Sequence, residues 1–230
     1  MGLFSYPDLY YFILVIPALI LAMIAQGYLK SIYRKMSRVF SSKGVTGAQA
    51  AISVLTYYGI DNVSVEPVSG TLSDHFDPRS SVIRLSEGVY SNTSIAAIGI
   101  ACHEAGHAAQ HNTQYVPIKI RNAILPVTNI GSALGLPLAI IGYFLSFQPL
   151  IAIGLFLYAL IAVFQIVTLP VEFNASKRAV AVIDEIGLLS VEEQPGAKKV
   201  LTAAALTYVA ALVVSIANIL RLILRFGSRR

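Results

Sequence analysis

The stretch His103-Glu104-Ala105-Gly106-His107 lies within residues 94–110, an apolar run rich in Ile, Ala and Gly that is typical of one buried helix. Positions i and i+4 of a helix return to nearly the same face, roughly 6 Å apart along the axis, so His103 and His107 can bind one metal ion together. Glu104 lies one position round the helix, where it can reach a water on that metal. The pattern therefore predicts a zinc site with a carboxylate as general base.

A pattern with two free positions also arises by chance, and two observations weigh against chance here. The chain has four histidines, and three of them (His103, His107 and His111) are clustered around this motif. The motif also lies in an apolar segment, where burying two imidazoles and a carboxylate is energetically unfavourable unless they serve a function. Both observations favour the metal interpretation.

The composition is that of an integral membrane protein. Hydrophobic residues make up 56% of the 230 residues and charged residues 13%, about half the usual share of a soluble domain. Uncharged segments near residues 9–29, 123–147, 150–169 and 201–220 are each long enough to be a transmembrane helix. The single cysteine, Cys102, excludes an intrachain disulfide, and we expect it to be a small buried residue.

Basic residues set the predicted orientation. Five of them follow the first apolar segment before any acidic residue, namely Lys30, Arg34, Lys35, Arg38 and Lys43. The positive-inside rule therefore predicts that residues 30–121 are cytoplasmic and that the N-terminus is outside. The same residues can also bind anionic lipid. Arginines near the C-terminus go against the rule if segment 201–220 spans fully.

Between the first two apolar segments the pattern predicts a small α+β portion. Residues 46–58 favour a helix with Thr46 as its N-cap, and residues 63–68 and 81–85 favour short strands. The second strand is a candidate edge for pairing with an extended peptide substrate. The polar loop between the strands, residues 69–79, contains His75 and Asp77, which can line a site or cap turns.

A third zinc ligand is expected outside the motif. His111 is unsuitable because it lies about 12 Å along the helix from His103. Residues 122–171 carry no charge and are long enough for a hairpin of two spans that turns at Gln148-Pro149. Glu172 is the first charge after the hairpin, so it returns to the membrane face of the motif, on a helix that we expect to run from Pro170 to Ile186. Glu172 can also be an ordinary interfacial acid, and the 69–79 loop can supply a ligand instead.

Four segments together resemble the YugP-like neutral zinc metallopeptidases of bacterial membranes: residues 72–78, 103–111, 170–176 and 203–210. The resemblance implies a gluzincin-type peptidase, and by analogy with HtpX-type membrane proteases Glu172 would be the third ligand. The family pattern has Asp where this chain has Asn174. An acid on this helix often orients a ligand histidine, which Asn174 can do only without charge.

The sequence thus predicts a mainly α membrane protein, residues 1–230 as one domain, with about four transmembrane helices and a small zincin-like α+β cytoplasmic portion (30–121 plus 170–199). The predicted activity is that of a zinc-dependent endopeptidase in the cell membrane. His103, His107 and Glu172 would hold Zn²⁺, and Glu104 would be the general base. His75 and Tyr208 are candidates for stabilising the oxyanion.

Two alternatives remain, and the first comes from another class of protein. One is a catalytically silent scaffold with a structural metal or none, which a closed fourth metal position would indicate. The other is site-2-type intramembrane proteolysis, but polar and basic residues follow the motif from Asn112 to Arg121 and favour an interfacial position. The expected partners are a peptide or membrane-protein substrate and the lipid bilayer; no nucleic-acid-binding motif occurs.

Overall fold

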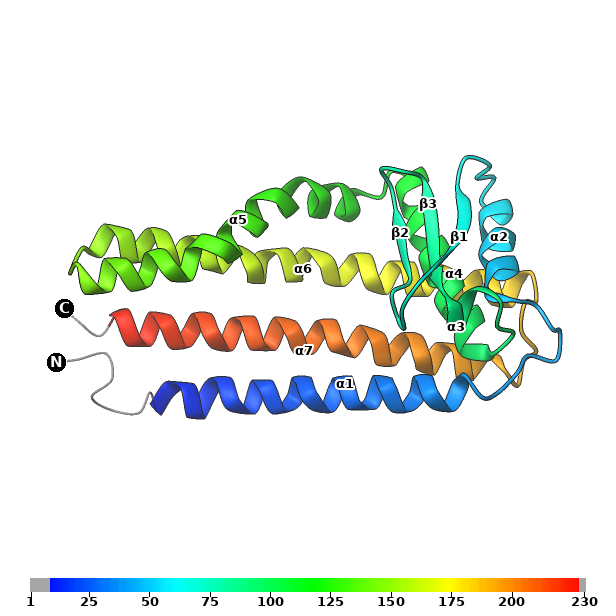
Figure 1. Cartoon of the computed structure of the whole chain (residues 1–230), viewed down its shortest axis with the longest axis horizontal. Coiled ribbons are helices and arrows are strands. Elements are labelled where there is room, and N and C mark those ends of the chain that lie inside the picture. The colour runs from blue at the N-terminus through cyan, green and yellow to red at the C-terminus, as the bar shows by residue number, and fades with distance from the viewer. Residues whose placement is uncertain (1–8, 228–230) are drawn as a thin grey trace. The chain divides into compact units, whose positions relative to one another are not determined.

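The structure is a computed structural model that describes residues 9–227, and it consists of helices and one small sheet (Figure 1). Internal contacts divide the chain into two compact units. The first unit contains residues 9–26, 120–168 and 207–227 of the described chain, and the second contains Gly27–Lys119 and Leu169–Leu206. The predicted class, mainly α with a small sheet, is confirmed.

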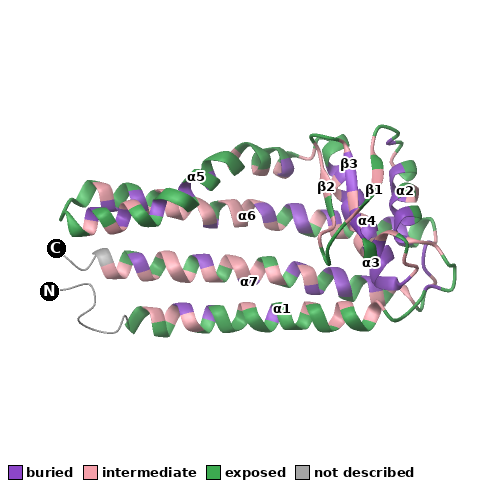
Figure 2. Ribbon diagram, viewed as in Figure 1, coloured by how far each residue is buried: buried purple, intermediate pink, exposed green. Residues whose placement is uncertain are grey.

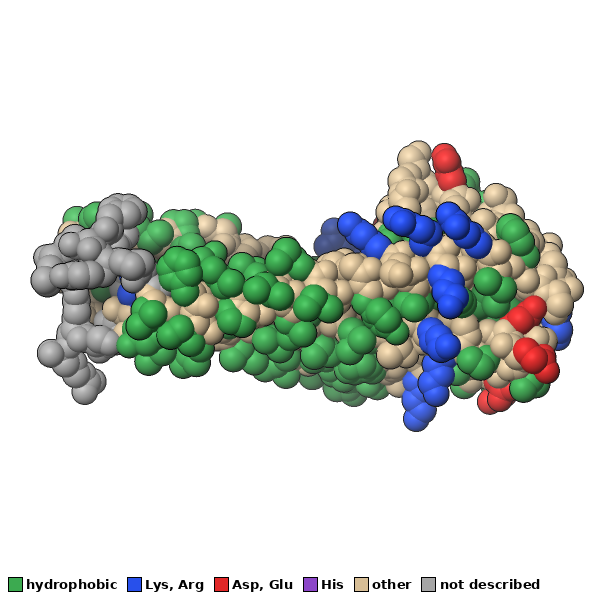
Figure 3. All heavy atoms as spheres, turned by 90° about the horizontal axis from the view of Figure 1, so that it is seen from below, with side chains coloured by type: hydrophobic (Ala, Val, Ile, Leu, Met, Phe, Trp, Pro, Cys, Tyr) green, Lys and Arg blue, Asp and Glu red, His purple; other side chains and the backbone are tan. Residues whose placement is uncertain are grey.

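Within the described residues, four helices are long and apolar enough to cross a membrane. They are Tyr11–Met36 (a π-helical turn at Tyr11–Val15 followed by α1, Ile16–Met36), α5 (Val116–Phe144), α6 (Gln148–Glu185) and α7 (Gln194–Gly227). Each predicted span falls largely within one of these helices. Figure 3 shows hydrophobic side chains over one face of the long helices, as expected for surfaces that meet lipid.

In the first unit, α5 and α6 form a hairpin whose backbones approach closely at glycines. A Cβ on Gly154 of α6 would stand 2.6 Å from the carbonyl oxygen of Gly135 on α5, so only hydrogen fits there. Small residues at such contacts are the usual means of helix packing in lipid, where apolar burial adds little. The turn spans Leu145–Phe147, just before the Gln148-Pro149 pair that was expected to form it.

The helix that carries Glu172 does not begin at Pro170, as the sequence suggested. Pro170 lies inside α6, which continues without interruption from Gln148 to Glu185. An interior proline removes one helical hydrogen bond and costs about 3 kcal/mol. Val171, Ala175 and Ala179, which follow it, are fully buried, and their packing sustains the helix beyond the proline.

The second unit begins with α2 (Gly47–Tyr57), whose predicted cap is confirmed. The Thr46 hydroxyl accepts a hydrogen bond from the Gln49 backbone N–H at 3.2 Å, and the Gln49 side-chain oxygen accepts one from the Thr46 N–H at 2.9 Å. This reciprocal pair satisfies two of the donors left open at a helix start. Gly59, just past the C-cap, has φ +64°, a backbone conformation that glycine adopts without strain.

The sheet of this unit has the strand order β1-β3-β2. β1 (Ser64–Val68) is parallel to β3 (Val82–Ser86), and β2 (His75–Asp77) is antiparallel to β3. The expectation that residues 81–85 form a free edge is therefore wrong, because β3 is paired on both sides. The strand β2 was not predicted, because it is only three residues long and two of its side chains are polar.

The core of the second unit surrounds α4 (Ile95–Asn112), which follows the short helix α3 (Glu87–Tyr90). α4 packs on α2 and also contacts β2 and β3. Ser94 caps it by accepting a hydrogen bond from the Ala97 N–H at 3.3 Å. Buried residues concentrate on α4 and β3 (Figure 2), and Cys102 is among them, as expected.

Candidate metal centre

α4 presents the two histidines of the motif side by side. The ring centroids of His103 and His107 are 4.7 Å apart, and the side chains are 14% and 12% exposed. This is the spacing that i and i+4 residues have on one face of a helix. The two side chains are therefore largely buried, and both Nε2 atoms are directed at the same neighbour on α6.

That neighbour is Glu172. Its Oε2 lies 3.3 Å from Nε2 of His103 and 3.6 Å from Nε2 of His107, and its side chain is 4% exposed. One donor atom from each of the three residues lies within 4.8 Å of the others. The structure thus brings together the three residues that the sequence proposed as ligands.

A glycine in the motif permits this approach of the two helices. A Cβ on Gly106 would stand 2.7 Å from the carbonyl oxygen of Ala175 on α6, closer than real Cβ atoms come to backbone. The second of the two free positions between Glu104 and His107 is therefore constrained to glycine by packing. A larger side chain at position 106 would displace α6 and carry Glu172 away from the histidines.

The donor set fits a divalent cation. Donor atoms held about 2.1 Å from a tetrahedral zinc lie about 3.4 Å from one another, close to the two separations above. Glu172 Oε2 is buried and has no hydrogen-bond partner in the described part of the chain. A buried carboxylate oxygen without a partner is unfavourable, and a bound cation would satisfy it.

The other ring nitrogens are held by hydrogen bonds. Nδ1 of His107 lies 3.0 Å from Oε1 of Gln110, and Nδ1 of His103 lies 3.1 Å from Oγ of Ser176. An amide oxygen can only accept, so His107 donates from Nδ1, which leaves the lone pair of Nε2 available to a metal. The Ser176 hydroxyl can accept in the same way from His103.

Gln110 extends this support to α6. It is fully buried, and its Nε2 donates to the carbonyl oxygen of Val171 at 2.7 Å and to Oδ1 of Asn174 at 3.0 Å. Oδ1 of Asn174 also accepts from Nε of Arg178 at 2.9 Å. Asn174, which stands where the family pattern has Asp, thus reaches His107 through Gln110. Both of these hydrogen bonds need only an oxygen acceptor at position 174.

Charge at the site favours a cation. Burial by itself lowers the pKa of His107, but the close approach of the Glu172 carboxylate to its ring and the charges of Glu104 and Glu172 outweigh it, so the pKa of His107 is raised. Two carboxylates beside two imidazoles stabilise positive charge, whether it is a proton or a metal ion.

Glu104 is also buried, with 8% of its surface exposed. Among the described residues, its carboxylate has neither a hydrogen bond nor an ion pair. It follows His103 on α4, one position round the helix, as expected from the motif. A general base must lie beside the atoms that hold the metal, and Glu104 meets this requirement. Its role as the general base stays a prediction.

The other candidates do not belong to this donor group. His75 is exposed on β2, with Nδ1 2.8 Å from the carbonyl oxygen of Ser73. Tyr208 is on α7, in the part of the helix that belongs to the first unit, and is 39% exposed. His111 lies beside the ring of Phe76, with centroids 6.0 Å apart. None of these three is in the cluster of donor atoms found among the described residues.

Asp77, the acid in the 69–79 loop that was an alternative metal ligand, forms hydrogen bonds within its own turn. It accepts hydrogen bonds from the hydroxyl of Ser80 at 2.7 Å and the backbone N–H of Arg79 at 2.9 Å, and these lower the pKa of its carboxyl to about 2. Arg84 forms an ion pair with it at 3.3 Å. Its geometry is that of a turn residue.

Sequence reasoning did not assign a role to Gln110 or Ser176. Gln110 is three residues after His107, and Ser176 is four residues after Glu172, so each shares a helix face with a proposed ligand. This spacing was the feature of the sequence that could have indicated their roles. Which polar neighbour contacts which ring depends on how α4 and α6 pack.

The candidate metal centre combines two histidines on one helix with a carboxylate on a second helix. With the four long apolar helices found among the described residues, this defines the class as a membrane protein with a candidate metal centre. Residues 11–227 match the family described as "Putative neutral zinc metallopeptidase", and the chain belongs to that family. It is 46% identical over 217 residues to the protein named "Putative membrane protease YugP" of Bacillus subtilis (strain 168), covering 94% of this chain and 96% of that one. No solved structure matches the chain. The resemblance drawn from the motifs is confirmed, and the apolar helices with the relative's name support a multi-pass membrane protein.

Proposed function

We propose that this chain is a zinc-dependent endopeptidase of the cell membrane, in which His103, His107 and Glu172 hold the metal. The observation that carries the proposal is the convergence of three donor atoms, one of which, Glu172 Oε2, is buried without a hydrogen-bond partner in the described part of the chain. Family membership supports it, since the family is described by zinc and peptidase activity. The buried Glu104 beside the donor set adds the group that hydrolysis needs.

Each residue of the site has a distinct role in the proposed mechanism. Glu104 takes a proton from the attacking water and later passes it to the leaving amine. Gln110 and Ser176 keep the Nδ1 atoms of the two histidines engaged, so that both Nε2 atoms stay directed toward Glu172. Zinc, when bound, supplies Lewis acidity toward the water and the scissile carbonyl. His75 and Tyr208 remain proposed stabilisers of the oxyanion.

An extended substrate would pair with β2 instead of β3. β2 is an edge strand and contacts α4, the helix that carries the histidines, whereas β3 is paired on both sides. Backbone groups on a free edge offer hydrogen bonds to a peptide of any sequence, which suits an endopeptidase. His75, the first residue of β2, would then lie along the substrate.

The two alternative functions give different experimental results. A silent scaffold would bind metal and hydrolyse nothing, whereas site-2-type proteolysis would cleave only within a membrane-spanning substrate segment. The basic residues after the first apolar helix, and the polar residues after the motif, favour a site at the cytoplasmic boundary. We therefore propose that the catalytic portion faces the cytoplasm.

The test compares the purified wild type with Glu104→Gln, each loaded with zinc. Glu104→Gln should keep stoichiometric zinc and the native fold, and should lose hydrolysis of an unfolded protein substrate by orders of magnitude, because the amide cannot accept the proton. Metal analysis and product identification by mass spectrometry measure both. Full activity in the zinc-loaded Glu104→Gln protein would refute the mechanism, and an inactive zinc-loaded wild type would favour the scaffold.

A further inference from the structure

A pocket separate from the donor cluster lies between α6 and α7 in the second unit. Its volume is about 410 Å³, and α6 and α7 line it with mostly apolar side chains. Phe173 and Leu206 at its margin are 49% and 44% exposed, so large apolar surface faces outward there. Exposed apolar surface of this kind marks a binding site or a contact with lipid.

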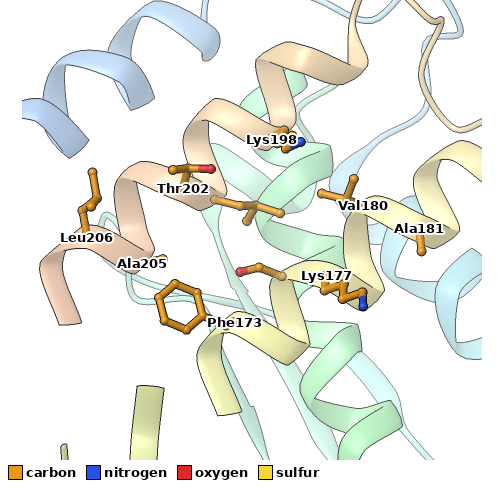
Figure 4. A pocket seen from close by; sticks show the side chains of 10 residues that line it. Phe173, Lys177, Val180, Ala181, Lys198, Thr202, Ala205 and Leu206 are labelled. Atoms are coloured by element: carbon orange, nitrogen blue, oxygen red, sulfur yellow. The ribbon is translucent and has the colours of Figure 1, made fainter. Parts of the chain in front are cut away.

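The pocket is polarised along its length. Because α6 and α7 run antiparallel, Phe173 lies near Ala205 and Leu206 at one end, and Val180 lies toward Lys198 at the other (Figure 4). Lys177 and Lys198 supply two positive charges, and none of the described residues that line the pocket is acidic. The end at Phe173 and Leu206 is thus uncharged, and the two lysines lie further along the pocket, where Val180 and Ala181 also line it.

The two ends also match the charge pattern of the sequence. The uncharged end adjoins the uncharged stretches 122–171 and 200–220, and the two lysines belong to the charged parts of both helices. In a membrane-spanning chain, such a change from uncharged to charged sequence marks the boundary between acyl chains and headgroups. The polarity of the pocket therefore runs in the same direction as that of a lipid in the adjoining leaflet.

We propose that this pocket binds one anionic phospholipid of the bilayer. One acyl chain lies against Phe173, Ala205 and Leu206, and the phosphate lies near the ammonium groups of Lys177 and Lys198. The volume accommodates part of one acyl chain, and the two lysines without an acid complement a negative headgroup. A zwitterionic lipid offers the same chain but a neutral headgroup.

Ser176 connects the pocket to the metal centre. It lines the pocket, and its Oγ is the atom that lies 3.1 Å from Nδ1 of His103. A bound acyl chain thus contacts the residue that orients a proposed zinc ligand, and lipid can modulate the site. This coupling rests on the proposed function, whereas lipid binding itself does not and is measured without zinc or substrate.

The chain contains no tryptophan, so one introduced tryptophan reports on a single position. The test places Leu206→Trp protein in nanodiscs with small mole fractions of phosphatidylglycerol or phosphatidylcholine that carry brominated acyl chains, which quench tryptophan on contact. Phosphatidylglycerol should reach half-maximal quenching at a roughly 5- to 25-fold lower mole fraction, since each of the two lysines near an anionic headgroup contributes up to roughly a factor of five. Ile216→Trp, at an exposed position further along α7, should show little preference between the two lipids.

Matched variants in the Leu206→Trp background identify the site. Lys177→Ala with Lys198→Ala should abolish the preference, and Lys199→Ala, which removes an exposed lysine outside the pocket lining, should retain it. If Leu206→Trp fails to fold, native mass spectrometry of the otherwise unmodified protein counts retained phosphatidylglycerol, which the double lysine variant should lose. Equal quenching by both lipids, or a preference that survives the double lysine variant, would overturn the proposal. So would displacement of the brominated lipid by a hydrophobic peptide that binds the pocket more tightly.

Discussion

The side-chain oxygen of Gln110 lies 3.0 Å from Nδ1 of His107, and the amide nitrogen of the same side chain donates to the carbonyl oxygen of Val171 at 2.7 Å. Val171 directly precedes Glu172. One buried amide therefore connects a proposed histidine ligand on α4 with the backbone next to the proposed carboxylate ligand on α6. The relative position of the two ligands depends on this side chain.

Removing that amide should weaken the metal site without removing a ligand. We expect Gln110→Ala to lower zinc affinity by about 10–100-fold, the usual effect of losing a hydrogen bond to a ligand histidine. Gln114→Ala, at an exposed residue just beyond the end of the same helix, should leave the affinity unchanged. Competition with a chelator of known zinc affinity measures both variants. Equal affinities for Gln110→Ala and the wild type would show that the contact does not position His107.

Glu172 should be required for metal and activity together. Glu172→Ala leaves two histidines, so zinc binding and hydrolysis should both be lost, in contrast to Glu104→Gln, which should lose hydrolysis alone. Glu172→Asp should be impaired in part, because it withdraws the carboxylate by one methylene, more than the roughly 0.2 Å tolerance of a metal bond. Asp184→Ala on the same helix is the control. Stoichiometric zinc at wild-type affinity in Glu172→Ala, with its loss in His75→Ala or Asp77→Ala, would assign the third ligand to the 69–79 loop.

The close contact at Gly106 predicts a packing defect with a functional consequence. Gly106→Ala would force a methyl group against the Ala175 carbonyl and should destabilise the fold by about 1–3 kcal/mol, as overpacked sites do. Because α6 must move to relieve the clash, zinc affinity should fall as well. Gly27→Ala is a matched control, since it also lies inside a helix but has nothing within 4 Å of the added Cβ. Thermal unfolding and zinc titration distinguish the two variants, and normal zinc binding in Gly106→Ala would show that α6 need not approach so closely.

The orientation of the chain can be measured by cysteine labelling. The basic residues after the first apolar helix predict that residues 30–121 face the cytoplasm. Single cysteines at Ser42 and Ser91, both exposed, should therefore escape a membrane-impermeant reagent applied to intact cells and react after lysis. The native Cys102 is buried and should contribute little background. Strong labelling of both positions in intact cells would reverse the orientation.

Much of the fold could be predicted because its signals are local. Helical spacing placed His103 and His107 on one face, the Thr46–Gln49 pair marked the start of α2, and the apolar stretches gave four long helices. The uncharged length of 122–171 also indicated that Glu172 returns toward the motif. Pairing between strands is a long-range property, and for that reason the sequence wrongly suggested β3 as an edge and missed the short strand β2.

The sequence by itself determined the motif, the helices, the change from uncharged to basic segments and membership of the family. Each of these follows from the order of residues over a few turns of helix or from similarity along the chain. Only the tertiary structure decided which side chains support the two histidines. Gln110 and Val171 are 61 residues apart, and Ser176 and His103 are 73 apart, so their contacts exist only once α4 and α6 pack. The physical reason is that the direction of a side chain depends on helix rotation and separation, which Gly106 and its neighbours set through close packing.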